Sequence, residues 1–203
     1  MVFVLAPRGA MAHPHAWVDM REQVILNNKN QITALREHWV FDEFYTEFAR
    51  QDYDLNHNGK LEHDELMKLG TDNLTRLRDY DFFTLVQEGG KAVKIKTFRD
   101  VDSAQVGNRI ALDFTLVFAA PVETAGQGIS YKIYDPSYYI EMKHEKENPV
   151  SFSGGTCHFT LTQPKPDISK IGLAATLDQL KQKPQAADNL GSYFAEKVDI
   201  TCP

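Results

Sequence analysis

Apolar and polar positions alternate, though imperfectly, from residue 16 to residue 41. One face of the first segment carries Val18, Met20, Glu22, Val24 and Leu26. The segment 27–30, Asn-Asn-Lys-Asn, then interrupts the alternation with residues that tolerate positive φ. The pattern predicts a β-hairpin whose second strand runs over residues 32–41.

From Asp42 the period becomes three to four residues, which predicts helices. A first amphipathic helix is expected to bury the stripe Phe41, Phe44, Tyr45, Phe48, Ala49 and Tyr53. A second helical segment over about 63–87 has five candidate inward positions and a candidate break at Gly70; the inward positions are Leu66, Leu69, Leu74, Leu77 and Tyr80.

After residue 90 the chain has the composition of short strands separated by Gly and Pro. The candidate strands are 92–98, 109–118, 129–134, 138–142, 150–153, 156–162 and 198–202, with a short helix at about 173–182. These elements predict an α+β fold: one antiparallel β-sandwich-like domain over 13–203, with a helix-loop-helix inserted at about 42–88.

The composition is that of an ordinary globular protein, with 42% hydrophobic and 25% charged residues among 203. The net charge of −6 gives no electrostatic footprint for nucleic acid and no basic patch for an anionic membrane. No apolar run approaches the roughly 20 residues that a membrane-spanning helix needs. We therefore expect neither nucleic-acid binding nor a membrane span.

Residues 1–12 form a short apolar run that ends in Ala10-Met11-Ala12, the small-x-small form of a signal-peptidase site. This predicts a signal-peptide remnant and a periplasmic or secreted protein. The alternative is an ordinary N-terminal strand.

The segment 54–65 fits the twelve-residue EF-hand calcium loop. Position 6 is Gly59, which permits the sharp turn, and position 8 is Leu61, which packs inward. The expected calcium ligands are Asp54, Asn56 and Asn58 through side-chain oxygens, Lys60 through its carbonyl, Glu62 through a water, and Glu65 as the bidentate final ligand. Because two of these positions are neutral asparagines, weak binding is expected, and calcium is expected to clamp the two helices rather than act as a signal.

Histidines provide a second candidate metal site. Cleavage after Ala12 would make His13 the first residue, so that its amine and imidazole could chelate Ni²⁺, Co²⁺, Zn²⁺ or Cu²⁺ together with His15 and, further along the chain, His38. The alternative is an exposed terminus that binds no metal. His144 and His158 fall in candidate strands, where isolated histidines are more often structural or exposed.

Two cysteines, Cys157 and Cys202, are expected to form a disulfide if the protein is exported. Cys157 beside His158 is a weak alternative as a nucleophile, because neighbouring residues of a strand point to opposite faces. No acid/base pair or nucleophile constellation is visible, so an enzyme is not expected.

The ordered motifs resemble a bacterial family of unknown function; they are the segments 13–19, 39–43, 54–65 and 134–139 and the two cysteines. Members of that family are described as periplasmic components of an uncharacterised ABC-type transport system and are often encoded beside nickel/cobalt-type or zinc-related transport genes. The resemblance implies a periplasmic accessory or binding protein that works with an inner-membrane metal transporter. The alternative is a calcium-stabilised secreted structural or interaction protein with no transition-metal role.

Overall fold

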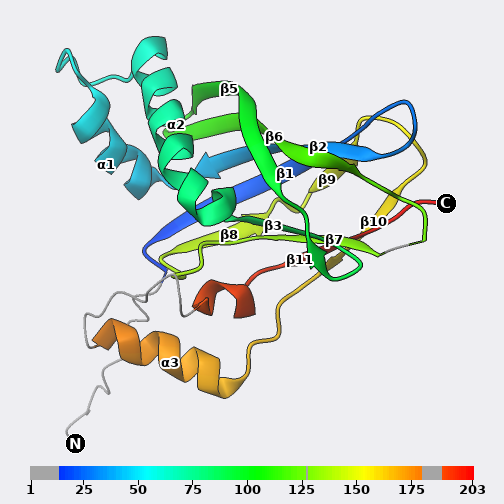
Figure 1. The fold of residues 1–203 in the computed structure, drawn as a ribbon. Helices are drawn as coiled ribbons and strands as arrows, with labels where there is room; N and C mark the ends of the chain where they lie inside the picture. Colours follow the sequence, from blue (N-terminus) through cyan, green and yellow to red (C-terminus); the bar gives the residue numbers. More distant parts are fainter. Residues whose placement is uncertain (1–13, 127, 180–188) are drawn as a thin grey trace, which may run out of the picture.

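Two β-sheets and a helix pair account for most of residues 14–126, 128–179 and 189–203, the parts of the chain that our computed structural model describes (Figure 1). The first sheet has the order β5-β6-β2-β1-β8, and β9 also pairs with β1. Its strands are β1 (Ala16–Leu26), β2 (Ile32–Phe41), β5 (Ile95–Val106), β6 (Arg109–Val122), β8 (Ile140–His144) and β9 (Val150–Phe152). The second sheet has the order β10-β11-β7-β3-β4 and consists of β3 (Thr84–Glu88), β4 (Lys91–Ala92), β7 (Ile129–Ile133), β10 (His158–Thr162) and β11 (Lys197–Thr201). The predicted mixed α+β class is confirmed.

The predicted hairpin of residues 16–41 is confirmed. β1 and β2 pair antiparallel with Val18 opposite Phe41, and Asn30 in the turn has φ 60°. Alternate residues of β1 are buried from Ala16 to Val24, because that face of the strand lies against the second sheet.

The far edge of the first sheet differs from the antiparallel arrangement predicted. β8 and β9 both pair with β1 in parallel, with Val18 opposite Met142 and Val24 opposite Phe152. The chain reaches β8 from β7 of the other sheet, so the connection is a crossover and not a hairpin.

Helices α1 (Glu43–Tyr53) and α2 (His63–Leu77) pack beside β5 and β6 (Figure 1). α1 buries Thr46 and Ala49, and the Thr46 hydroxyl accepts a hydrogen bond from the Ile110 backbone N–H at 3.0 Å. Phe44 is 73% exposed and Phe48 is 59% exposed. The prediction that these two phenylalanines belong to the core is therefore wrong, because the helix contacts the sheet through its smaller residues.

Gly70 does not break α2, contrary to the prediction, but lets the helix approach the sheet closely. A Cβ atom at this position would lie 2.8 Å from Leu112 Cδ1 and 3.3 Å from Ser103 Cβ. Leu66, Leu69 and Leu74 are buried as expected.

The second helical segment ends ten residues earlier than predicted. After Leu77 the 3₁₀ segment η1 (Arg78–Phe83) contains three successive residues with positive φ, Asp81 to Phe83, and Tyr80 is half-exposed. Residues 84–88 then form strand β3 and not helix. The apolar Leu85 and Val86 continue a helical spacing in the sequence, which explains the error.

The disulfide between Cys157 and Cys202 is present, as predicted for an exported protein. It extends the antiparallel β10–β11 pair, in which His158 lies opposite Thr201, and so fastens the C-terminal strand. Helix α3 (Ile168–Gln179) lies on the other side of the sheets from the α1–α2 pair, and the short 3₁₀ helix η3 (Leu190–Tyr193) precedes β11 (Figure 1).

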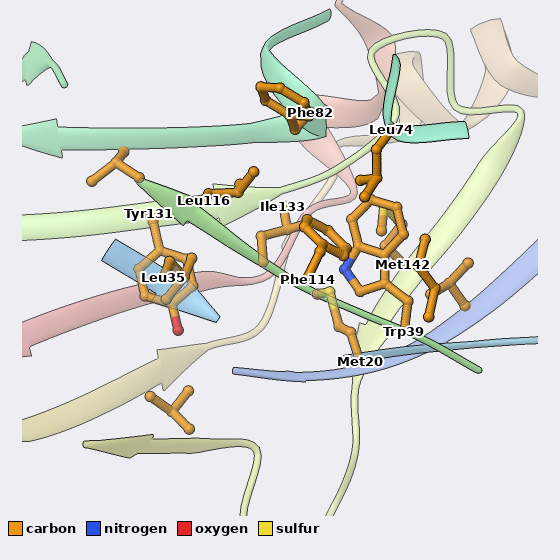
Figure 2. Packing of buried hydrophobic residues seen from close by; sticks show 14 of the residues in the cluster. Met20, Leu35, Trp39, Leu74, Phe82, Phe114, Leu116, Tyr131, Ile133 and Met142 are labelled. Atoms are coloured by element: carbon orange, nitrogen blue, oxygen red, sulfur yellow. The ribbon is translucent and has the colours of Figure 1, made fainter. Parts of the chain in front are cut away.

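The core fills the space between the two sheets and under α2. Trp39 packs edge-on against Phe114, with ring centroids 5.0 Å apart. Figure 2 shows side chains from both sheets and from α2 meeting there, among them Met20, Trp39, Phe114, Met142, Leu74, Tyr131 and Ile133. In the described part of the chain, no helix is both long enough and apolar enough to cross a bilayer.

Candidate calcium loop and a buried charge cluster

The segment 54–65 runs from the end of α1 through the connecting loop into the first turn of α2, as the sequence predicts. Upstream, Asp42 caps α1 by accepting a hydrogen bond from the Tyr45 backbone N–H at 2.9 Å. Downstream, Glu62 and Glu65 form a capping box at the start of α2, in which each side chain accepts a hydrogen bond from the other's backbone N–H. The N-terminal ends of both helices are therefore fixed by side chains.

The first half of the loop wraps around the Asp54 carboxylate. Its Oδ1 accepts a hydrogen bond from the Asn58 backbone N–H at 3.0 Å, and its Oδ2 accepts one from the Gly59 N–H at 2.7 Å. Gly59 has φ +82°, a left-handed conformation that glycine adopts without strain. His57 is also left-handed, with φ 59°. The turn thus forms at the position where the motif requires glycine.

Glu65 closes the loop. Its Oε1 accepts a hydrogen bond from the Leu55 N–H at 2.8 Å and its Oε2 accepts one from the Glu62 N–H at 3.0 Å. The single carboxylate therefore joins the beginning of the loop to its end. Leu61, only 7% exposed, packs into the core as expected.

Glu62 completes the polar side of the loop, and its carboxylate accepts hydrogen bonds from the side-chain amides of Asn58 and Asn56. These bonds, the one from Asn58 most of all, lower the pKa of Glu62. The Asn56 and Asn58 amide oxygens in turn accept backbone N–H groups, from Asn58 and Lys60 respectively. The side-chain oxygens of Asp54, Asn56, Asn58 and Glu62 therefore all accept hydrogen bonds from within the loop.

The acidic side chains of the loop do not by themselves form a metal site. Within residues 14–126, 128–179 and 189–203, no three His, Cys, Asp or Glu side chains are grouped as a metal site would require. A calcium loop of this kind also uses amide and backbone oxygens, which such a grouping leaves out. The donor set of the loop, which is all oxygen, suits a hard cation such as calcium.

The candidate transition-metal histidines are not brought together. His13 lies outside the described residues, and His15 stacks on Tyr139 with ring centroids 4.8 Å apart. His38 lies opposite Arg21 in the hairpin, and its Nδ1 is 2.8 Å from Asp113 Oδ2. Since six residues of strand span about 20 Å, His38 is too far from His15 to share an ion with it.

A buried cluster of charged residues, which no sequence motif predicts, lies between the sheets. His144, at the end of β8, has its Nδ1 2.7 Å from Glu196 Oε2 and its Nε2 2.9 Å from Glu22 Oε2. The side chains of His144, Glu22 and Glu196 are 1%, 0% and 5% exposed. The contact with Glu22 has an ion-pair distance, but its angle is too bent for a hydrogen bond. The cluster links the first sheet to the segment that leads into β11.

The carboxylates favour the protonated form of His144. Burial alone lowers the pKa of His144, but contacts with Glu196 and Glu22 outweigh burial and raise the pKa to about 9. Burial raises the pKa of Glu196, but the hydrogen bonds that Glu196 accepts from His144 outweigh burial and lower its pKa. For Glu22, burial outweighs the histidine and the pKa is raised. The Tyr131 hydroxyl donates a further hydrogen bond to Glu22 at 3.1 Å.

Glu37, which lies opposite Glu22 on β2, is fully buried and takes no part in an ion pair among the described residues. Burial raises the pKa of Glu37 well above its ordinary range, and the nearby Glu22 adds to this. Glu37 Oε1 lies 2.8 Å from Thr84 Oγ1, which is itself 3.1 Å from the Phe82 carbonyl. The threonine has one hydroxyl proton, so a protonated Glu37 that donates to Thr84 lets Thr84 donate to Phe82.

Strand alternation is the signal that could have identified these acids. Glu22 shares the apolar face of β1 with Met20 and Val24, and Glu37 shares a face of β2 with Leu35 and Trp39. A glutamate among inward positions is rarely left without a partner, but the sequence does not name that partner.

The fold and the loop define a class: a two-sheet α+β protein with a helix-loop-helix between its second and third strands. A family model described as "Protein of unknown function (DUF1007)" matches residues 1–202, and the chain belongs to this family. The chain is also 28% identical, over 198 residues, to an uncharacterised protein of Haemophilus influenzae; the match covers 96% of this chain and 93% of that protein.

Proposed function

We propose that loop 54–65 binds one calcium ion, which holds α1 and α2 together in a periplasmic accessory protein. The observation that carries this proposal is the loop geometry: the carboxylates of Asp54 and Glu65 are positioned by backbone N–H groups at the two ends of a turn centred on Gly59. Every expected ligand belongs to this one loop: Asp54, Asn56, Asn58, the Lys60 carbonyl, Glu62 and Glu65.

Calcium would neutralise part of the acidic charge on the loop and replace hydrogen bonds that now hold its ends. The ligand charges are few, so we expect a dissociation constant of about 10⁻⁴ to 10⁻³ M. At about 10 mM calcium, binding of this strength stabilises the folded state by roughly 1.4 to 2.7 kcal/mol.

Calorimetric titration of calcium into the wild-type protein tests the proposal, with two variants beside it. Glu65→Gln removes the bidentate ligand, whereas Asp64→Asn removes an equal charge from the exposed neighbouring position, which is not a ligand. We expect the first variant to lose calcium binding and the second to bind like wild type. Equal heats from all three proteins would refute the assignment.

For the whole protein we propose a role beside an inner-membrane transporter of nickel, cobalt or zinc. This role is what the resemblance of the sequence motifs implies, and the disulfide fits an oxidising compartment. The test is transition-metal binding by protein that begins at His13, compared with protein carrying one extra N-terminal residue and with His15→Ala. Affinity unchanged by either alteration would exclude the terminal site.

The second candidate, an interaction protein whose only metal is calcium, is favoured by the outer face of α1. Phe44 and Phe48, one helical turn apart on α1, are each more than half exposed, and so is Leu55 in the loop that follows. Exposed apolar groups of this kind commonly mark binding surfaces. Replacing Phe44 and Phe48 by serine is expected to leave stability unchanged and to abolish binding of any partner recognised by this face.

A further inference from the structure

An apolar cavity of about 210 Å³ lies between the helix pair and the inner face of the first sheet. Its walls come from β1, β2, β6 and β8 on the sheet side and from α1, α2 and η1 on the other; Trp39, Leu112 and Met142 contribute to the floor. Figure 2 shows Trp39 and Met142 side by side at this place. The cavity is larger than the roughly 150 Å³ that accommodates benzene, and smaller than most drug-sized sites.

Polar groups enter the cavity wall only from the helices. Asn73 of α2 donates a side-chain hydrogen bond to the Tyr45 hydroxyl oxygen at 2.8 Å. That hydroxyl keeps its own proton, and none of the described residues accepts it in a hydrogen bond. Arg76, one turn after Asn73, also borders the cavity, and its side chain is exposed. No described carboxylate lies within salt-bridge distance of the Arg76 guanidinium.

Tyr45 and Arg76 border the same cavity. Burial raises the pKa of Tyr45, and the positive charge of Arg76 acts on it in the opposite direction. The Tyr45 and Arg76 side chains therefore add a hydroxyl and a guanidinium to the border of a cavity whose wall is otherwise mostly hydrocarbon. This arrangement complements a molecule with an apolar body and a single negatively charged, hydrogen-bond-accepting head.

We propose that the cavity binds a small hydrophobic monocarboxylate, an aromatic ring or short alkyl chain whose carboxylate pairs with Arg76 and accepts a hydrogen bond from the Tyr45 hydroxyl. Burial of the apolar body in a preformed apolar cavity supplies most of the affinity, since no well-bonded water has to be displaced. The guanidinium and the hydroxyl supply the preference for an acid. This site does not depend on calcium occupancy of the loop.

The test is calorimetric titration of 3-phenylpropionate and octanoate, each compared with the alcohol that has the same tail. The variants are Arg76→Gln and Tyr45→Phe, with Arg78→Gln as the matched control, because Arg78 packs over Phe98 and does not border the cavity. Loss of a hydrogen bond to a charged group predicts about tenfold weaker acid binding in each of the first two variants. The control is expected to bind the acids like wild type. The affinity for the alcohols is expected to be unchanged in Arg76→Gln.

Two results would overturn the proposal: no saturable binding of either acid below about 1 mM, or equal acid affinity in Arg76→Gln and Arg78→Gln. Thermal unfolding of each variant without ligand verifies that the fold is intact. Acid binding is also measured with calcium, with chelator and in Glu65→Gln, which removes calcium binding and does not border the cavity. Equal acid affinity under all three conditions distinguishes this site from the calcium loop.

Discussion

The cluster of Glu22, His144 and Glu196 makes the stability of the protein depend on pH. The pKa of His144 is raised from an ordinary 6.5 to about 9, so the folded state holds this proton more tightly than the unfolded chain does. The stabilisation is therefore fully present below pH 6.5 and is lost as the pH rises through about 9. A tenfold difference in proton affinity is worth about 1.4 kcal/mol, so the full loss is about 3 kcal/mol.

Urea unfolding between pH 6 and pH 10 measures this loss, and about two thirds of it is expected between pH 7 and pH 9. In His144→Gln the fall over that window should be smaller, since the group that titrates there is gone. The titration of the His144 ring, followed by NMR, identifies the group directly. A ring that titrates at or below 6.5 in the folded protein, or equal slopes in the two proteins, would refute the reasoning.

Three further substitutions test other parts of the fold. Gly191→Ala should destabilise the protein by about 1 to 3 kcal/mol or more, because the new Cβ atom would lie 1.9 Å from the Asp135 carbonyl oxygen. Urea unfolding measures the loss, and unchanged stability would contradict this close contact. Replacing Cys157 and Cys202 by serine should cost up to about 4 kcal/mol by loop entropy, which a lowered urea midpoint would reveal. Glu37→Gln should change stability by less than about 1 kcal/mol at pH 7, because the amide reproduces the hydrogen bonds of a protonated carboxyl; a loss of several kcal/mol would indicate an ionised Glu37.

Local patterns predict local structure well in this chain. The hairpin of residues 16–41, the starts of the two helices and the loop at 54–65 all depend on neighbouring residues, and all form where expected. The error at Thr84–Glu88 arises because a short apolar segment fits either period, and only pairing with β7 makes it a strand.

Contacts between distant segments decide what the sequence could not reveal. The exposure of Phe44 and Phe48 follows from which side of α1 meets the sheet, and helical spacing alone fits both sides. The partners of Glu22 are His144 and Tyr131, which no local pattern joins to it. The candidate calcium loop could be predicted from the sequence because all its ligands lie in one short segment. The buried cluster and the apolar cavity are formed by residues from several elements, so the sequence did not predict them.

The parallel pairing of β1 with β8 has a consequence for the order of events during synthesis. Trp17 and Glu141 are partners across this pair although they are 124 positions apart. Until β8 has left the ribosome, one side of β1 has unsatisfied backbone groups, and a bare strand edge is a site for association with other chains. Such distant pairing also slows folding. A helper protein that covers the N-terminal hairpin before β8 emerges would therefore raise the yield of folded protein more than one that acts on the completed chain.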